Sequence, residues 1–420
     1  MTMFQGAGAL LSIIAIFGFI NHRFLKLPDT LGITAVGLLA CLCFAIASSG
    51  HPEMVAHARG LVGKIDFSDL VFHGLLSLLL FAGALHVDIS RMRAVKLPVF
   101  LLATVGVVIS TAVVGVGFHL LTLAVGHPVG LLWSLVFGAL ISPTDPIAVM
   151  SVLKNAGVVE SVEVKIAGES LFNDGTAVVA FVTLLGLATG SSELSVGHIA
   201  LSLVREVVGA GVLGLVLGYG AFLLLRGIDS YAIEIMLSLS LATAGYSLAE
   251  AVHVSAPLAV VVMGLMIGNH GATRAMSEQT RQHLFAFWHL LDELLNLVLF
   301  GLIGLEVIAL SSLFKADIIA LGILAIPVVL VARAVSVYAP LTALRAFREM
   351  SPHTVKIMTW GGLRGAISIA LALSLPEFEG RDVLIGVTYI VTIFSLLGQS
   401  TTLGLFIRRL NGPICKKNLT

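Results

Sequence analysis

Long apolar runs, separated by short polar connections, fill this chain of 420 residues from end to end. Apolar residues make up 58% of the chain and charged residues 11%, whereas soluble domains average ~45–50% and ~25%. A helix that crosses a bilayer needs about 20 mostly apolar residues, and its backbone polar groups must be hydrogen-bonded within the protein. These constraints predict an all-α polytopic membrane protein with little soluble mass.

Windows of this length predict about thirteen transmembrane helices. The candidate spans are residues 5–20, 31–48, 70–87, 97–125, 130–153, 163–188, 198–225, 231–250, 256–269, 290–311, 316–344, 354–375 and 383–407. The ninth span is short, and we expect residues 272–288 to form a separate amphipathic stretch at the membrane interface.

Basic residues are concentrated in alternate connections between the predicted spans. One set of connections holds most of them, including Arg23, Arg91 and Arg408, whereas the other set holds few, including Arg205 and Arg381. Cytoplasmic connections carry the excess of Lys and Arg. The pattern therefore predicts a protein of the cell (inner) membrane with its N-terminus outside and its C-terminus in the cytoplasm. The formal net charge is zero, which gives no reason to expect a nucleic-acid partner.

Two predicted spans are interrupted at corresponding positions in the two halves of the chain. The fifth is broken by SPTDP at 142–146 and the twelfth by GGLRG at 361–365. Matching breaks of this kind mark transporters built from inverted repeats, with an ion site near the membrane midplane. We therefore expect a single transmembrane domain, 1–420, with a first inverted repeat of six helices (1–190), a connecting helix (191–229), a second inverted repeat (230–411) and a short cytoplasmic tail (412–420).

Carboxylates inside the apolar spans are the strongest indication of function. Asp145 lies in the broken fifth span, and Glu169 and Asp174 lie in the sixth. A charged residue at the centre of a bilayer costs at least ~2.5–3.5 kcal/mol, so such residues are rare and usually functional. With Ser170 and Asn173 beside them, these acids predict a site for a cation or a proton.

The spacing within the sixth span predicts one polar stripe. Residues four apart share a helix face, so Ser170 stacks with Asp174 and Glu169 stacks with Asn173. Asp174 supplies an ionisable oxygen and Ser170 a neutral one, and hard cations prefer such ligands. The alternative is a buried polar network that only holds helices together.

The prolines of the SPTDP motif shape the fifth span. Pro143 and Pro146 lack a backbone donor and disfavour helix in the residue before them. The helix is therefore expected to unwind near Thr144 and Asp145, which frees the Thr144 carbonyl to face a cation. The alternative is a kink in which Asp145 only caps the second half-helix.

Two arginines, Arg333 and Arg364, fall inside predicted spans. An arginine stays charged even when buried, so each needs an acidic or a carbonyl partner. We expect Arg364 to pair with Glu169, which leaves the two aspartates to exchange ions. A local pair between Glu169 and Lys165 is the alternative.

These segments resemble the monovalent cation/proton antiporter family, in its NhaP-type sodium/proton branch. The matching pieces extend over nearly the whole chain and are LLFAGALHVD at 79–88, TDP at 144–146, ESLFNDG at 169–175, GLE at 304–306 and GGLRGAIS at 361–368. Ala82 departs from the pattern, because many relatives carry an acid in this stretch.

The resemblance implies a thirteen-span fold with two inverted six-helix repeats whose broken helices cross. It also implies a homodimer in which a core bundle moves against a dimerisation scaffold. Gly214 and Gly218 form a small-xxx-small face on the seventh span, which further suggests a dimer contact.

The resemblance also implies the roles of the site residues. Ion binding is expected at Asp174, Asp145, Ser170 and the Thr144 carbonyl, with a transported monovalent cation and no resident cofactor. Asn173 is expected to brace the site, Glu169 and Arg364 to form a structural ion pair, and Arg333 to be a second buried arginine.

Competition at one carboxylate explains how such a protein exchanges ions, since the group holds a proton or a cation but not both. The resemblance of Asn173-Asp174 to relatives with one-for-one exchange implies electroneutral transport of Na⁺ (or Li⁺) against H⁺, serving Na⁺ extrusion and pH homeostasis, and not an enzyme activity. A K⁺/H⁺ antiporter of the same fold is the alternative. An ion channel is disfavoured because the sequence has no filter-like repeat. An intramembrane aspartyl protease using Asp145 and Asp174 is disfavoured by the prolines and buried arginines.

Overall fold

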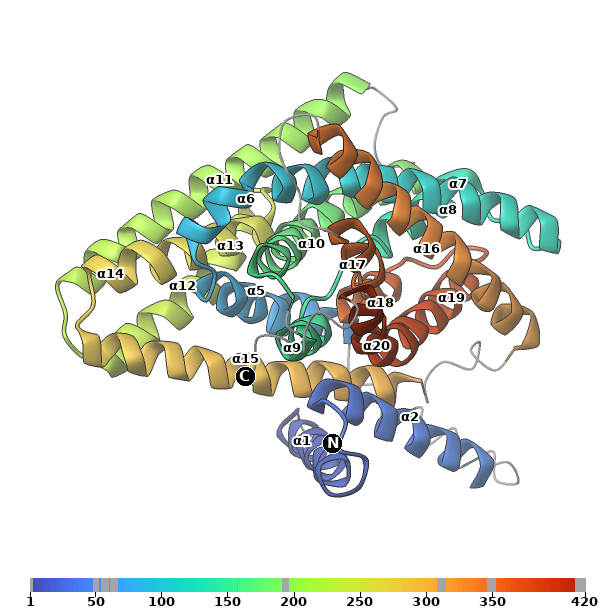
Figure 1. Cartoon of the computed structure of the whole chain (residues 1–420), viewed down its shortest axis with the longest axis horizontal. Helices are drawn as coiled ribbons and strands as arrows, with labels where there is room; N and C mark the ends of the chain where they lie inside the picture. The colour runs from blue at the N-terminus through green and yellow to red at the C-terminus, as the bar shows by residue number, and fades with distance from the viewer. Residues whose placement is uncertain are drawn as a thin grey trace. The chain divides into compact units, whose positions relative to one another are not determined.

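The computed structural model describes residues 3–47, 53, 60, 67–156, 158–190, 196–307, 315–345 and 353–411. Over these residues the chain is built from helices without any strand (Figure 1). The predicted all-α class is therefore confirmed. The predicted tail, 412–420, lies outside the described residues.

Within the described part of the chain, nine helical segments are long and apolar enough to cross a bilayer. They are Gln5–Leu25, Ile89–Val125, Glu160–Ala188, Val204–Arg226, Tyr231–Ala251, Ala256–Arg274, Glu278–Glu306, Ala316–Leu344 and Arg381–Leu410. Three shorter apolar helices cover Asp29–Phe44, Leu70–Leu85 and Leu131–Leu140. The count of thirteen spans stays a prediction.

The amphipathic stretch expected over residues 272–288 is continuous with the span that follows it. Helix α15 runs without interruption from Glu278 to Glu306. It buries Leu284 and Trp288 completely, and the Trp288 indole donates a hydrogen bond to the Ser238 hydroxyl at 2.9 Å. The interfacial position of the stretch stays a prediction.

The chain divides into two compact units, and each unit combines two separate stretches of sequence. The first unit comprises Met1–Ile89 and Leu194–Leu313, and the second comprises Ser90–Glu193 and Phe314–Thr420. Both units therefore contain segments from the first and the second predicted repeat. The boundaries of the repeats themselves stay a prediction.

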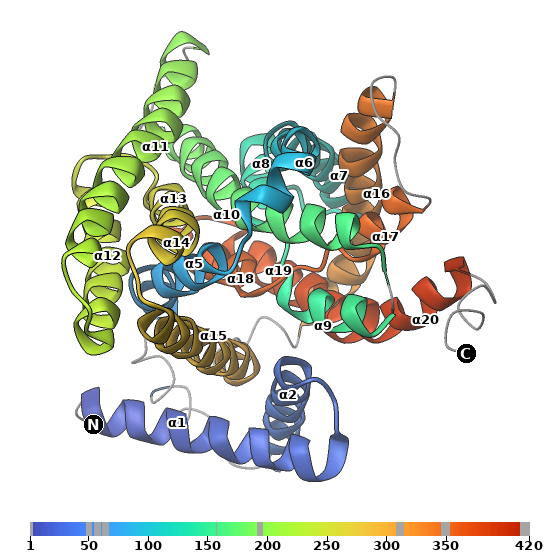
Figure 2. The ribbon, with the colours of Figure 1, turned by 60° about the vertical axis from the view of Figure 1, so that its left-hand side comes forward.

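The first unit contains α1 (Met3–Ile20), η1 (Asn21–Leu25), α2 (Asp29–Ala47), α4 (Phe67–Asp69), η2 (Leu70–Leu75), α5 (Leu76–Leu85), α11 (Val196–Arg226), α12 (Tyr231–Ala251), α13 (Ala256–Met266), η4 (Ile267–Gly271), α14 (Ala272–Arg274) and α15. Helix α13 packs against α5, α11 and α12 (Figure 2). A Cβ placed on Gly214 would lie 2.7 Å from the Ala259 carbonyl oxygen of α13. The small-residue face with Gly218 therefore serves packing inside this unit, and the suggested dimer contact there is wrong.

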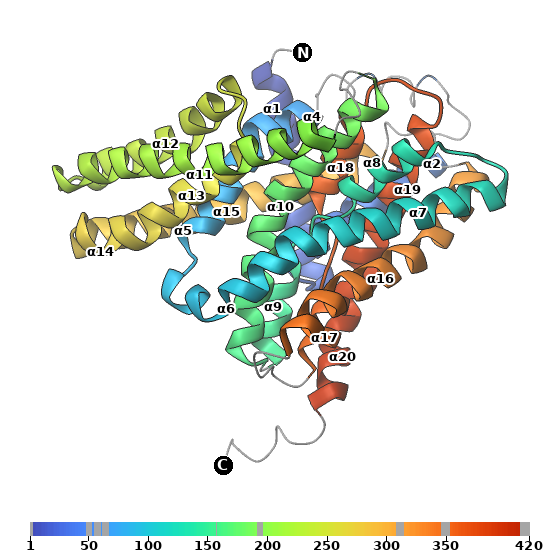
Figure 3. The same ribbon diagram turned by 90° about the horizontal axis from the view of Figure 1, so that it is seen from above.

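The second unit contains most of α6 (Ile89–Leu101), η3 (Leu102–Gly106), α7 (Val107–Val125), α8 (Leu131–Leu140), α9 (Ile147–Ala156), α10 (Glu160–Ala188), α16 (Ala316–Arg345), α17 (Thr354–Trp360), α18 (Ala366–Leu373), α19 (Arg381–Ile393), η6 (Phe394–Gln399) and α20 (Ser400–Asn411). Helix α7 packs along both α8 and α16 (Figure 3). Both predicted breaks are confirmed, since non-helical segments separate α8 from α9 and α17 from α18.

Close packing of α7 on α8 depends on glycine. A Cβ on Gly138 would lie 2.3 Å from the Thr111 carbonyl oxygen, a backbone atom that has no room to withdraw. We expect Gly138→Ala to lower the midpoint of thermal unfolding in detergent, because overpacking of this kind costs about 1–3 kcal/mol. In the control Gly211→Ala, the new Cβ meets nothing within 4 Å. An equal midpoint for the two variants would contradict the proposed backbone contact.

Candidate ion-binding site

The two helix breaks meet within the second unit. The backbone N–H of Asp145, in the first break, donates to the carbonyl of Leu363, in the second break, at 2.8 Å. A Cβ placed on Gly365 would lie 2.7 Å from the Asp145 Oδ2. Glycine at position 365 therefore lets the second break lie directly against the Asp145 side chain.

An arginine side chain from another part of the unit bonds carbonyls at the C-terminal end of each half-helix that ends at a break. Arg364 Nη1 donates to the carbonyls of Ser142 at 2.6 Å and Pro143 at 3.1 Å, just beyond the end of α8. Arg333 Nη2 donates to the carbonyl of Met358, in the last turn of α17, at 3.1 Å. A cation is favourable there, because the last carbonyls of a helix lack intrahelical partners and carry partial negative charge.

Arg333, and not Arg364, is the ion-pair partner of Glu169. Its Nη1 and Nη2 donate to the two carboxylate oxygens, with the second contact at 2.9 Å. The Glu169 and Arg333 side chains are 2% and 8% exposed. The expected Glu169–Arg364 pair is therefore wrong, and so is the Lys165 alternative. Arg364 Nη1 instead bonds carbonyls of the broken helix, while its Nη2 is a buried donor without a hydrogen-bond partner among the described residues.

The predicted polar stripe on α10 is directed at the first break. The Ser170 hydroxyl donates to the Thr144 carbonyl, and Asn173 Nδ2 donates to the Thr144 Oγ1 at 2.8 Å. Thr144 is thus held by both Ser170 and Asn173, and the role of Asn173 as a bracing residue stays a prediction. The role of the Thr144 carbonyl as a cation ligand stays a prediction, and a carbonyl oxygen has a second lone pair for it.

Asp174 follows on the same helix face and is 8% exposed. Among the described residues, its Oδ1 is a buried acceptor without a hydrogen-bond partner, and so is the Oδ1 of Asn173. The Asp145 carboxyl group is close enough to act electrostatically on that of Asp174. Buried acceptors are costly unless something bonds to them. A small cation is a group that both oxygens can bind, and the carboxylate oxygen can also take a proton.

Asp145 also caps the half-helix that follows the first break. Its Oδ1 accepts a hydrogen bond from the backbone N–H of Ile147 at 2.8 Å, which caps the start of α9. Capping does not exclude ion binding, because an ionised carboxylate offers about four lone-pair sites.

Two residues of the site were not found from the sequence. The Ser395 hydroxyl accepts from the backbone N–H of Arg364 at 2.8 Å and donates to Gln399 Oε1 at 2.7 Å. Gln399 Nε2 in turn donates to the carbonyl of Trp360 at 3.3 Å. Ser395 and Gln399 therefore bond backbone groups on both sides of the second break. A glutamine in an otherwise apolar span was the available signal.

The Glu169–Arg333 pair should show strong energetic coupling. Arg333→Gln leaves a buried carboxylate without its partner, which typically costs about 3–5 kcal/mol. We expect a large drop in thermal stability for Arg333→Gln and a partial recovery in the double variant with Glu169→Gln. Lys165→Gln serves as the control and should combine additively with Glu169→Gln. If the stability losses of Arg333→Gln and Glu169→Gln were also additive, the direct ion pair would be contradicted.

The chain is similar to known proteins over nearly its whole length. Residues 9–409 match the model of a family described as "Sodium/hydrogen exchanger, transmembrane". The chain is 44% identical to the Na⁺/H⁺ antiporter NhaP of Pseudomonas aeruginosa, over 97% of both chains. It is 33% identical to the Na⁺/H⁺ antiporter NhaH of Halobacillus aidingensis, over 92% of this chain and 93% of that protein.

A solved structure has the same fold. It is the sodium proton antiporter MjNhaP1 from Methanocaldococcus jannaschii at pH 8, with a TM-score of 0.75 and 21% sequence identity. The similarity covers 98% of this chain and 100% of that one.

Proposed function

This chain belongs to the sodium/hydrogen exchanger family, and we propose that it exchanges Na⁺ (or Li⁺) for H⁺, one for one, across the cell (inner) membrane. The observation that carries the proposal is the buried Asp174 Oδ1, an acceptor without a partner among the described residues, on the helix whose Ser170 and Asn173 bond to the first unwound segment. Its relatives named as Na⁺/H⁺ antiporters support the choice of ions.

Competition at Asp174 drives the exchange. A carboxyl group shut off from water is more favourable with a bound proton or a bound cation than as a bare charge. When a cation enters, Asp174 and Asp145 supply carboxylate oxygens. The Ser170 hydroxyl turns a lone pair to the ion, and releasing its bond to the Thr144 carbonyl makes that oxygen a ligand as well. One set of four oxygens then replaces part of the ion's hydration shell.

The surrounding charges support a one-for-one stoichiometry. Glu169 and Arg333 neutralise each other in a bidentate pair, so neither has to exchange a proton. Asn173 carries no charge, so Asp174 is the one group of the stripe on α10 that has to exchange a proton. We infer that one proton leaves for each cation that enters, so that neither exchange direction moves net charge.

Alternating access requires that the loaded site reorients between the two sides of the membrane. We infer that residues 1–190 and 230–411 form inverted repeats around the connecting helix, and that two copies of the chain form a homodimer. The distribution of basic residues supports an outside N-terminus and a cytoplasmic C-terminus. In that orientation an inward proton gradient expels Na⁺, a role in Na⁺ extrusion and pH homeostasis.

Asp174→Asn should abolish exchange without unfolding the protein, because it removes the ionisable oxygen and keeps the shape of the side chain. The measurement uses purified protein in proteoliposomes with an internal pH dye, pulsed with Na⁺, Li⁺ or K⁺. In the wild type, Na⁺ and Li⁺ pulses should move protons, and clamping the voltage with valinomycin and K⁺ should leave the rate unchanged.

The matched control is Asp382→Asn, the same change at an exposed aspartate of the same unit outside the site, which should retain the cation-driven proton flux. Proton movement driven by K⁺ and not by Na⁺ would replace the proposal with K⁺/H⁺ exchange. A rate that follows the clamped voltage would contradict electroneutrality. Full activity in Asp174→Asn would remove the site from the mechanism.

Ser170→Ala should raise the KM for Na⁺ by about tenfold and leave the maximal rate within about twofold, since one neutral ligand is worth roughly 1–1.5 kcal/mol. The same variant should keep its dependence on internal protons, because Asp174 is intact. An unchanged KM for Na⁺ would show that the Ser170 hydroxyl stays on the Thr144 carbonyl throughout the cycle.

A further inference from the structure

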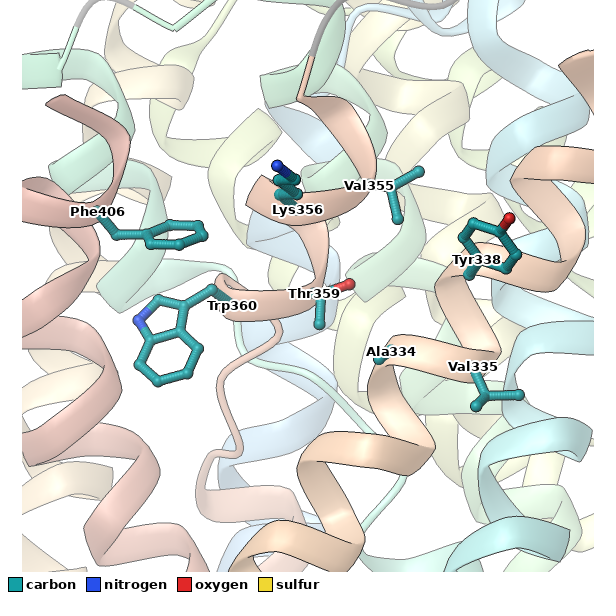
Figure 4. A pocket seen from close by; sticks show the side chains of 8 residues that line it. All are labelled: Ala334, Val335, Tyr338, Val355, Lys356, Thr359, Trp360 and Phe406. Carbon is teal, nitrogen blue, oxygen red and sulfur yellow. The ribbon is translucent and has the colours of Figure 1, made fainter. Parts of the chain in front are cut away.

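An apolar groove crosses the outer face of α17 in the second unit and has a volume of about 440 Å³ (Figure 4). Its lining includes Ala334, Val335 and Tyr338 of α16, Lys356 and Trp360 of α17, and Phe406 of α20. The volume falls within the ~300–1,000 Å³ of typical ligand sites. Among the described residues that line the groove, Lys356 is the charged one (Figure 4).

The aromatic end of the groove is fixed by contacts between α17 and α20. The Trp360 indole N–H donates to the Thr402 hydroxyl at 3.2 Å, and the Trp360 and Phe406 rings lie 5.8 Å apart. Because its N–H is already bonded to Thr402, Trp360 can present an apolar ring surface to a ligand. These contacts set the orientation of the Trp360 ring at this end of the groove.

Positive charge lies at one end of the groove. Lys356 is exposed, and it shares a helix face with Trp360, four residues further on. Within the part of the chain that the structure describes, Lys356 has no acidic partner. An anionic group at this end of the groove would therefore meet unneutralised charge.

We propose that this groove binds an anionic phospholipid, with an acyl chain along the apolar lining and the phosphate at Lys356. Large apolar side chains in and beside the groove are exposed, as on a surface that contacts lipid: Tyr338 on α16 is 59% exposed and Leu405 on α20 is 62% exposed. Basic residues at a membrane surface attract anionic headgroups. The apolar lining can pack against an acyl chain. A soluble anion has no apolar part that would use this lining.

The bound lipid lies one helix away from the ion site. Lys356 and Trp360 face the groove, whereas Met358, between them on α17, is completely buried and its carbonyl accepts from Arg333. A lipid in this groove contacts both α16 and α17, the two helices that Arg333 joins through the Met358 carbonyl. The binding inference does not depend on which cation the protein exchanges.

Native mass spectrometry of the purified full chain tests the proposal, with palmitoyl-oleoyl phosphatidylglycerol and the corresponding phosphatidylcholine as probes. The wild type should prefer phosphatidylglycerol. Lys356→Gln should weaken phosphatidylglycerol binding about fivefold, the change that roughly 1 kcal/mol per basic residue produces. Lys96→Gln is the matched control, since Lys96 is an exposed lysine of the same unit outside the groove, and it should behave like the wild type.

Two further arms separate a lipid from its headgroup alone. Val335→Trp narrows the groove from an exposed position and should weaken both lipids, while the thermal unfolding midpoint without lipid reports on folding. Soluble glycerol 3-phosphate should not compete with phosphatidylglycerol. Equal binding of the two lipids, equal affinities of Lys356→Gln and Lys96→Gln, or competition by glycerol 3-phosphate would each overturn the proposal.

Discussion

Unwound helices inside a bilayer leave backbone groups that water cannot satisfy, and the second unit is organised around that constraint. The two breaks bond to each other where the Asp145 N–H meets the Leu363 carbonyl. Arg364 takes the carbonyls at the end of α8, and Arg333 takes a carbonyl at the end of α17. Because these groups are satisfied by the protein, the chain can hold non-helical backbone at the depth of the carboxylates.

The two buried arginines therefore have different partners. Arg333 bonds both Glu169 and the end of a half-helix. The resulting ion pair has no net charge and links α10, α16 and α17. Among the described residues, the side chain of Arg364 bonds backbone carbonyls and no carboxylate, and it keeps a positive charge beside the break that contains Asp145. A net positive charge at that place offsets part of the repulsion between Asp145 and Asp174.

The sequence was sufficient for the membrane class, both helix breaks and the stripe on α10, because each depends on local rules. Apolar length, proline chemistry and the four-residue helix repeat act over one segment at a time. The partner of Glu169 depends on which of two distant helices brings its arginine to α10, and no local pattern encodes that. Gly214 is a second example, because the sequence does not say whether its small-residue face packs on another copy or on a helix of the same chain. Ser395 was missed because a hydroxyl in an apolar span has many uses.

The central claim is that a proton and a cation compete for Asp174, and proton release on cation binding tests it most directly. Purified protein in weakly buffered detergent solution, with a pH-sensitive dye, is titrated with Na⁺ and with choline as the control for ionic strength. The account predicts release of about one proton per bound Na⁺ and none in Asp174→Asn. Binding of Na⁺ to the wild type without proton release would contradict it.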